Sequence, residues 1–219
     1  MQKIKDHTRL QLLNTAREAF FKKGFKAVSM REISQKSGVG LSNIYNYYPN
    51  KDSLLADVLK PLLDDIESMM QEHNAPGRFT VEIFTSEELL RHWIERSLRI
   101  VFHYRRELKL LLFESQGSGY QHHVREWAES EASEMGRIYL DEMKTHYPQL
   151  YTDISPLFMH FASSLWLNML RVVVLHEELT KKEVENFVEE FVRFSTGGWG
   201  KLLRAEQAIP SDLLTHQRS

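Results

Sequence analysis

The chain has 219 residues, of which 42% are hydrophobic and 26% are charged, and its formal net charge is −2. This length suits one large domain or a small domain joined to a larger one. The absence of cysteine excludes disulfides, cysteine-ligated zinc and a cysteine nucleophile. The polar, periodic start lacks the apolar segment of a signal peptide, so we expect a cytoplasmic protein.

The charge is distributed unevenly along the chain. Residues 1–53 carry ten Lys or Arg and four Asp or Glu, which gives +6, whereas residues 54–219 carry 18 and 26, which gives −8. An asymmetry of this kind favours a polyanion-binding end, for example one that binds nucleic acid, joined to an acidic body. Small basic domains are also common, so charge alone leaves that simpler interpretation open.

Most segments have the hydrophobic period of a helix, and no convincing strand pattern is present, which predicts an all-α fold. The first helix is expected over residues 4–23, with Gly24 in the left-handed conformation that follows a helix end. Ser29 begins the second helix and is predicted to form a capping box with Glu32, in which each side chain bonds the other's backbone N–H. Gly38 ends this short helix.

The next turn leads into a third helix, which is expected over residues 41–47 and is stopped by Pro49. Asn50 is the predicted cap of a fourth helix over 51–72, where Pro61 removes a backbone hydrogen bond and tends to kink the helix. The rest of the chain is expected to form a loop or irregular turn at 78–84 and then helices at 86–104, 105–115, 120–146, 154–178 and 181–205.

Residues 157–175 are apolar and long enough to suggest a membrane span. They also contain His160, Asn168 and Arg171, and a charge near the centre of a bilayer is costly. We therefore expect a buried helix of a bundle and no membrane partner.

Two helices joined by a turn around Gly38, the second short and rich in small polar side chains, match a helix-turn-helix. A recognition helix must fit the major groove of DNA, with its polar groups outward and its apolar groups in the core. In the third helix, Ile44 and Tyr48 share a face and are predicted to anchor it in the core.

The outward face of that helix carries the candidates for reading bases, which are Leu41, Ser42, Asn43 and Asn46. Serine and asparagine hydrogen-bond base edges, and leucine can contact a thymine methyl. Arg31, at the start of the second helix, is placed to reach a guanine or a phosphate.

The remaining candidates are expected to contact the DNA backbone. Tyr47 is predicted to point outward and to donate its hydroxyl to a phosphate. Lys51 lies in the first turn of the fourth helix, where its ammonium and the free N–H groups attract an anion. Tyr45 is predicted to lie between core and surface, as half support and half contact. An exposed Tyr47 without a partner is the alternative interpretation.

The stretches SMREISQKSGVGLSNIYNYYPNKDSLL and TRLQLLNTAREAFFKKGFKAVSM resemble the DNA-binding motif of TetR-family transcriptional regulators over roughly residues 8–56. The resemblance supports the base contacts above and implies phosphate contacts at Ser29, Tyr45, Tyr47 and Lys51. Gly40 and Leu41 stand where polar or basic residues are common in the family, so the base specificity is not carried over.

This resemblance implies an all-helical homodimer that represses transcription from a pseudo-palindromic double-stranded DNA operator and is released by an unknown small-molecule effector. The implied organisation is a helix-turn-helix domain over 1–50, with its motif at about 28–48, a ligand-binding and dimerisation domain over 51–208, and a tail over 209–219. The alternative is a helix-turn-helix protein that responds to a protein partner or binds DNA constitutively.

The last two helices carry an apolar stripe, which in this family packs against the same helices of a second copy. The alternative is that the stripe fills the core of its own protomer. The residues expected at the dimer interface are Phe161, Leu165, Val184, Phe187, Phe191, Phe194 and Trp199.

Aromatic side chains and a polar line on an apolar helix are the candidates for an effector pocket. Steps of four, four and three keep the polar residues near one face, and buried polar groups need partners. Core packing is the alternative for the aromatic residues, and hydrogen bonds across helices are the alternative for the polar ones. The candidate ligand-binding residues are Trp93, Phe102, Phe113, Trp127, His160, Ser164, Asn168 and Arg171.

Metal and enzyme chemistry are not indicated. His122 and His123 are adjacent, so they cannot share a helix face as an i, i+4 pair of metal ligands does. The run Gly38-Val39-Gly40 follows a helix and lacks the Gly-Lys-Ser/Thr ending of a phosphate loop. We expect no catalytic residues, no metal and no cofactor.

Overall fold

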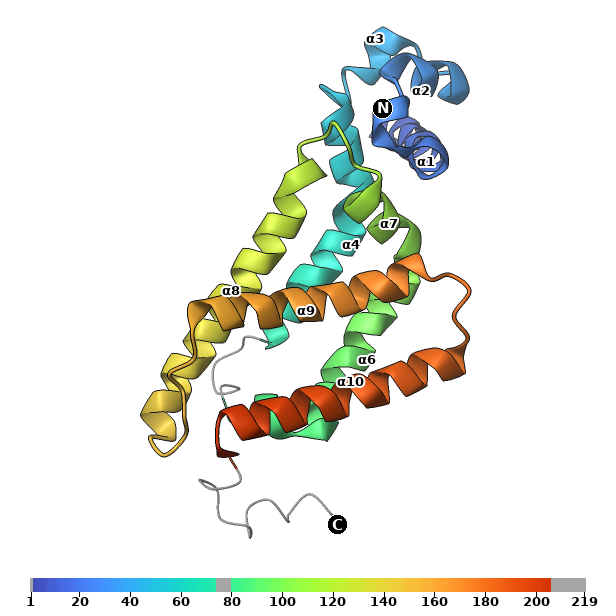
Figure 1. Ribbon diagram of the computed structural model, residues 1–219. Helices are drawn as coiled ribbons and strands as arrows, with labels where there is room; N and C mark the ends of the chain where they lie inside the picture. The colour runs from blue at the N-terminus through green and yellow to red at the C-terminus, as the bar shows by residue number, and fades with distance from the viewer. Residues whose placement is uncertain (1, 74–79, 206–219) are drawn as a thin grey trace. The chain divides into compact units, whose positions relative to one another are not determined.

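The computed structural model describes the backbone of residues 2–73 and 80–205, and the side chains of these residues other than 2–5, 122–129 and 131–133. Every regular element in this part of the chain is a helix, which confirms the all-α prediction (Figure 1). The helices are α1 (Gln2–Ala27), α2 (Met30–Ser37), α3 (Leu41–Ile44), α4 (Lys51–His73), α5 (Glu82–Thr85), α6 (Glu87–His103), α7 (Arg105–Phe113), α8 (Tyr120–His146), α9 (Pro156–Leu175) and α10 (Lys181–Leu202).

The long helices of the body begin and end within about three residues of their predicted limits, because capping residues mark their starts. Thr180 and Glu183 form the complete capping box at the start of α10, and the hydroxyl of Ser155 caps α9. The loop expected at 78–84 is wrong in part, since residues from Glu82 onward form α5, and Val81 before it is buried.

The chain divides into two compact units, of which the smaller comprises Met1–Met69 and Phe102–Trp127. This unit is larger than the domain predicted over residues 1–50, because it takes in most of α4, all of α7 and the start of α8. Leu12, Ala16 and Phe20 recur at helical spacing on α1 and are fully buried. Arg17 on the same helix pairs with Glu107 of α7, a buried carboxylate.

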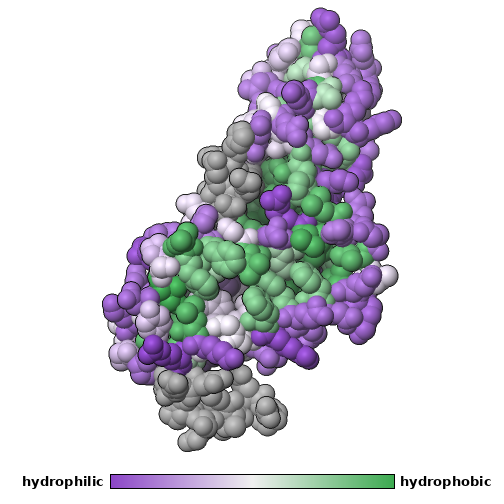
Figure 2. Space-filling model, in the orientation of Figure 1, coloured by the Kyte–Doolittle hydropathy of each residue, from purple (hydrophilic) through white to green (hydrophobic). Residues whose placement is uncertain are grey.

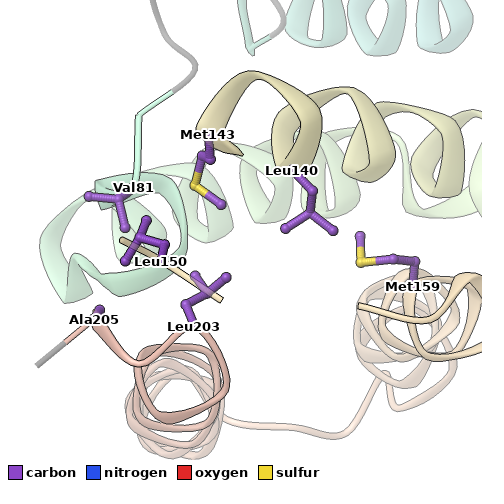
Figure 3. Close-up of a cluster of buried hydrophobic side chains, with 7 residues drawn as sticks. All are labelled: Val81, Leu140, Met143, Leu150, Met159, Leu203 and Ala205. Carbon is purple, nitrogen blue, oxygen red and sulfur yellow. The ribbon is translucent and has the colours of Figure 1, made fainter. Parts of the chain in front are cut away.

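The larger unit comprises Met70–Val101 and Ala128–Ser219. A cluster of buried apolar side chains from α8, α9 and the segments before α5, after α8 and after α10 forms part of its core, and Figure 3 shows these side chains pointing toward one another. Phe84 and Trp199 pack against this cluster. The tail predicted over 209–219 lies outside the described residues.

Helix α9 is long and apolar enough to cross a membrane by length and composition, but only 28% of its most apolar window is buried within the chain. The expectation that this helix is buried is therefore wrong for the single chain. A single helix of this kind is weak grounds for a membrane span, since core helices of soluble proteins have the same composition. The exposed apolar surface of α9 is instead a candidate protein interface.

Candidate DNA-binding surface

Helix α1 is kinked at Gly24, close to its end, and the residue that follows α7 holds this kink. Gly24 has φ 72° and ψ 165°, so its φ is positive as predicted, but its ψ lies outside the left-handed helical region and in a region open almost only to glycine. A Cβ at this position would lie 3.3 Å from the carbonyl oxygen of Glu114. The N–H of Phe25 donates to that same oxygen at 2.9 Å. The chain therefore enters α2 from a rigid turn.

The start of α2 contains half of the predicted capping box. The hydroxyl of Ser29 accepts the N–H of Glu32 at 3.1 Å, as expected. The prediction of the reciprocal bond, from the backbone N–H of Ser29 to Glu32, is wrong. The Glu32 carboxylate instead pairs with Lys23 at 2.7 Å and Lys36 at 2.8 Å. The hydrogen bond from Lys23, followed by that from Lys36, lowers the pKa of Glu32 to about 2. Arg31, the next residue toward the cap, is exposed.

The turn between α2 and α3 is held by side chains on both sides. Gly38 ends α2 in the left-handed conformation, with φ 70° and ψ 4°. The backbone of Val39 accepts the hydroxyl of Ser34 at 2.7 Å and donates to the hydroxyl of Ser37 at 3.3 Å. From α1, the amide of Gln11 donates to the carbonyl of Ser37 at 2.6 Å. This turn sets the point at which α3 begins.

The two faces of α3 are divided as predicted. Ile44 is fully buried and Tyr48 is 3% exposed, so both anchor the segment. Ser42, Asn43 and Asn46 are exposed, and Leu41 is half-buried. The amide of Asn46 donates to the side-chain oxygen of Asn43 at 3.3 Å, which lines up donors and acceptors on one surface.

The two tyrosines beside this face are exposed in the opposite order to the prediction. Tyr45 is 49% exposed, whereas Tyr47 is half-buried. The reason is that α3 ends at Ile44 and residues 45–47 form turns, so a regular helical projection does not apply beyond the fourth residue. Tyr45 therefore has the hydroxyl better placed at the surface, and the phosphate contacts of both tyrosines stay predictions.

Lys51 has internal partners in addition to its expected place at the start of α4. Its ammonium donates to the carbonyl oxygens of Phe25 at 2.8 Å and Val28 at 2.7 Å and lies 4.0 Å from the ring centroid of Phe25. Burial lowers the pKa of Lys51, against the opposing effect of Asp52. This lysine ties α4 to the α1–α2 turn, and its phosphate contact stays a prediction.

Arg9 and Asp57 form a contact that the sequence does not predict. The guanidinium of Arg9 on α1 donates to one carboxylate oxygen of Asp57 on α4, and Tyr48 donates to the same oxygen. These residues are far apart in sequence, and their charges also fit ordinary exposed positions, so no local pattern could have grouped them.

The aromatic candidates for an effector pocket are distributed over both units. Trp93 is 6% exposed in the larger unit, and the edge of His73 approaches it with ring centroids 4.5 Å apart, as in a packed core. Phe102 and Phe113 belong to the smaller unit, where Phe102 is half exposed and Arg105 covers its ring. The side chain of Trp127 lies outside the described residues. Their grouping into one pocket stays a prediction.

The polar line on α9 does not face a buried interior in the described chain. His160 and Asn168 are exposed, and Ser164 and Arg171 are half-buried. The hydroxyl of Ser164 donates to the backbone carbonyl of His160, its own helix. The expectation of a buried polar line is therefore wrong, because the line lies among side chains that the single chain leaves partly open to water.

The residues predicted at a dimer interface differ in exposure. Phe161 is 59% exposed and Phe194 is 68% exposed. Val184 is 7% exposed and is therefore buried within its own protomer, and its place in a dimer interface stays a prediction. Trp199 also packs inward, against Phe84. Leu165, Phe187 and Phe191 are half-buried, and the ring centroids of Phe187 and Phe191 lie 6.5 Å apart.

Titratable side chains do not gather into a metal site in the part of the chain that the structure describes, where no group of three His, Asp or Glu residues is arranged to hold an ion. The expectation that the protein has no metal or cofactor stays a prediction.

Residues 12–58 match the family model described as bacterial regulatory proteins, tetR family. The match covers α2 and α3, most of α1 and the start of α4. It therefore contains every candidate DNA-binding residue.

Relatives and solved structures agree with this match. The HTH-type transcriptional repressor KstR2 of Rhodococcus jostii (strain RHA1) is 30% identical over 113 residues, which cover 49% of this chain and 53% of the repressor. The chain thus spans about half the length of this curated relative. Salmonella enterica GusR superposes with a TM-score of 0.59 at 17% identity, over 90% of this chain and 95% of that one. A member of the TetR transcriptional regulator family from Streptomyces coelicolor A3 superposes with a TM-score of 0.53 at 21% identity, over 85% and 90%. At such identities these two structures support the fold alone.

Proposed function

Because the chain belongs to the tetR family of bacterial regulatory proteins, we propose that it is a sequence-specific DNA-binding repressor of transcription that acts in the cytoplasm as a homodimer. The observation that carries the proposal is the exposed polar face of α3, which stands on the fully buried side chain of Ile44. A segment anchored in this way presents hydrogen-bonding groups at a fixed position, as a reader of base edges must.

Base reading is assigned to Ser42, Asn43 and Asn46, with Leu41 and Arg31 beside them. The asparagine side chains each offer a donor and an acceptor, and both are exposed. Asparagine pairs with adenine through two hydrogen bonds in the major groove. The hydrogen bond between Asn46 and Asn43 restricts their rotamers before DNA arrives, which lowers the entropic cost of binding.

Backbone contacts are assigned to residues around this face. Tyr45 and Ser29 are exposed, the latter at the start of α2, and Tyr47 is half-buried. Lys51 lies in the first turn of α4, where free N–H groups favour an anion. The +6 charge of residues 1–53 attracts the duplex regardless of its sequence.

A selection experiment tests this proposal. The purified full chain is incubated with a pool of duplexes that contain a random central segment, and the bound fraction is amplified and sequenced. We expect a pseudo-palindromic motif, because a two-fold dimer presents two copies of α3 to the duplex. Failure to enrich any motif would contradict the proposal.

A matched pair of variants locates the readout. Asn43→Ala should relax the preference at one position of each half-site and cost about 1–3 kcal/mol against the selected duplex. Asn14→Ala is the control, because Asn14 is also an exposed helical asparagine but lies on α1. Equal loss in both variants would count against base reading by α3.

The dimer is assigned to the surface of α9 and α10. Leu157 is 79% exposed, Phe161 59% and Phe194 68%, and Figure 2 shows hydrophobic side chains gathered over these helices. Apolar patches of this kind mark protein interfaces. Because the same surface on a second copy is complementary to itself in a two-fold pair, a homodimer covers it without leaving an open end.

Release by a small molecule bound in the larger unit is the remaining part of the proposal, with family membership as its support. Mass spectrometry of the purified protein under non-denaturing conditions, followed by a gel shift with any molecule found, tests it. Loss of the shifted band on addition of that molecule is the expected result. A band that no bound molecule alters favours the alternative, a protein controlled by a protein partner or bound to DNA constitutively.

A further inference from the structure

One carboxylate oxygen in the smaller unit accepts three hydrogen bonds. The Oδ2 atom of Asp57 lies 2.7 Å from the hydroxyl of Tyr48. The same atom lies 2.7 Å from Nη2 of Arg9 and 3.2 Å from Nε of Arg9. The Asp57 side chain is 17% exposed and that of Arg9 is 59% exposed, so the carboxylate is shielded while the guanidinium reaches it from the surface.

These three residues join the parts of the unit that must hold the DNA-reading segment. Arg9 belongs to α1, Asp57 to the second turn of α4, and Tyr48 ends the turns that follow α3. Helix α3 is only four residues long, and Gly40 before it gives no side-chain cap. The orientation of so short a helix therefore depends on what fixes the residues after it.

Apolar burial alone does not fix that orientation. Packing of Ile44 and of the Tyr48 ring is strong, but the hydrophobic effect has no direction. A hydrogen bond from a phenol to a charged oxygen is directional and stronger than a neutral one. It selects one direction of the Tyr48 side chain from its Cα, and with it one placement of the backbone that carries Asn46.

The ionisation states needed for this arrangement hold at neutral pH. Burial, followed by Asp57, raises the pKa of Tyr48 to about 12, so the phenol keeps its proton. Burial opposes ionisation of Asp57, but the hydrogen bonds from Tyr48 and Arg9 outweigh it and keep the pKa of this carboxyl below its ordinary value. The donors and the charged acceptor are thus all present under physiological conditions.

We propose that Tyr48, Asp57 and Arg9 form a positioning network that sets the sequence discrimination of the α3 segment, residues 41–48, without touching DNA. This inference rests on the proposed function. Discrimination between duplexes depends on the orientation of α3, whereas the affinity for DNA of any sequence depends on the charge of the smaller unit.

The test compares two phenylalanine variants that each remove one hydroxyl from the same kind of bond. Tyr48→Phe removes the bond to Asp57. Tyr104→Phe is the matched control, because its hydroxyl donates to Asp65 of the same helix, α4, at 2.9 Å but does not belong to the α3 segment. Affinities are measured for the duplex selected by the wild-type chain and for a scrambled duplex of equal composition, well below the melting temperature of each variant.

We expect Tyr48→Phe to reduce the ratio of specific to non-specific affinity about fivefold, the size of one directional hydrogen bond. The scrambled duplex should bind unchanged, and Tyr104→Phe should leave the ratio at its wild-type value. An unchanged ratio in Tyr48→Phe would overturn the inference. Equal weakening toward both duplexes would also overturn it, because that result belongs to a phosphate contact. A wild-type chain that selects no duplex contradicts the proposed function instead.

A double-mutant cycle tests whether the residues act as one network. If Asp57→Ala has already removed the acceptor, adding Tyr48→Phe should reduce the specificity ratio no further. Full additivity of the two losses would show that the residues act independently and would overturn the inference. Melting temperatures, measured in parallel, separate this loss of discrimination from a loss of folded protein.

Discussion

Exposed side chains of the two units differ in kind. Around α3 the exposed residues include Ser42 and Asn43, which are polar and stand above the buried Ile44. On α9 and α10 they include Phe161 and Phe194, which are 59% and 68% exposed. A polar surface is satisfied by water until a duplex replaces it, whereas an apolar surface of this size is stable only when covered. The first surface is complete in one chain, and for the second we propose that another copy covers it.

The largest expected effect is on the second surface. Phe161→Asp places a charge where the proposed dimer excludes water, and two-fold symmetry places it there twice. We expect the dissociation constant of the dimer to rise at least about 30-fold, since a hot-spot aromatic residue contributes at least about 2 kcal/mol. Analytical ultracentrifugation over a range of concentrations measures it.

Leu10→Asp is the control for this variant. Leu10 on α1 is 58% exposed, nearly the same fraction as Phe161, but it belongs to the smaller unit. It should leave the association state unchanged. If Phe161→Asp remains a dimer, or if Leu10→Asp also dissociates, the contrast between the two surfaces is wrong.

The next largest effect is that of Lys51, in the smaller unit, on the free energy of unfolding. Lys51→Ala removes the ammonium that donates to the carbonyls of Phe25 and Val28 and leaves the Phe25 carbonyl only the N–H of Val28 at 3.3 Å. We expect it to lower the free energy of unfolding by about 1–3 kcal/mol. Lys60→Ala, on the same helix, removes an exposed i, i+4 pair with Asp64 and should cost under about 1 kcal/mol. Urea unfolding of both variants measures the difference.

This pair also decides how Lys51 acts on DNA. If Lys51→Ala is as stable as Lys60→Ala but has a shallower salt dependence of DNA affinity, the side chain is a phosphate ligand rather than an internal anchor. A Lys51 substitution used to test phosphate binding must therefore be accompanied by an unfolding curve.

The parts of the structure that sequence predicts well are those fixed by local pattern. Ser29 caps α2 because its hydroxyl is three residues from the N–H it accepts, and Ile44 is buried because it lies on the apolar face of a short helix. Helix limits and the recognition face follow from the same short-range rules.

The parts that sequence does not predict depend on distant partners. Glu32 has the local pattern of a capping box, yet two lysines from different helices compete for its carboxylate. Lys51 finds carbonyls 23 and 26 residues away. The polar line on α9 has helical spacing, which predicts only that His160 and Asn168 share a face. Whether that face is buried depends on which distant residues pack against it.

A smaller effect tests the reversed exposure of the two tyrosines. Tyr45→Phe should weaken binding by about 0.5–1.5 kcal/mol toward all duplexes alike, because its exposed hydroxyl is the better placed donor to a phosphate. Tyr47→Phe should have less effect, since this side chain is half-buried. Fluorescence anisotropy with the selected and scrambled duplexes measures both. The opposite ranking would restore the order predicted from a regular helix.

The smallest effect concerns Glu32 and pH. The folded-state pKa of Glu32 is about 2, below its ordinary value of 4.5, because Lys23 and Lys36 stabilise the carboxylate. The stabilisation is therefore fully present above pH 4.5 and is lost as the pH falls toward 2. The difference in melting temperature between the wild-type chain and Glu32→Gln should shrink over this window.

Glu134→Gln, which removes exposed pairing within α8, is the control from the larger unit. Because Glu32 joins α1 to α2, whereas Arg137, the described partner of Glu134, lies on the same helix as Glu134, we expect the larger pH-dependent difference at Glu32. Equal differences would mean that the cross-helix pair adds nothing to the smaller unit beyond an ordinary surface ion pair.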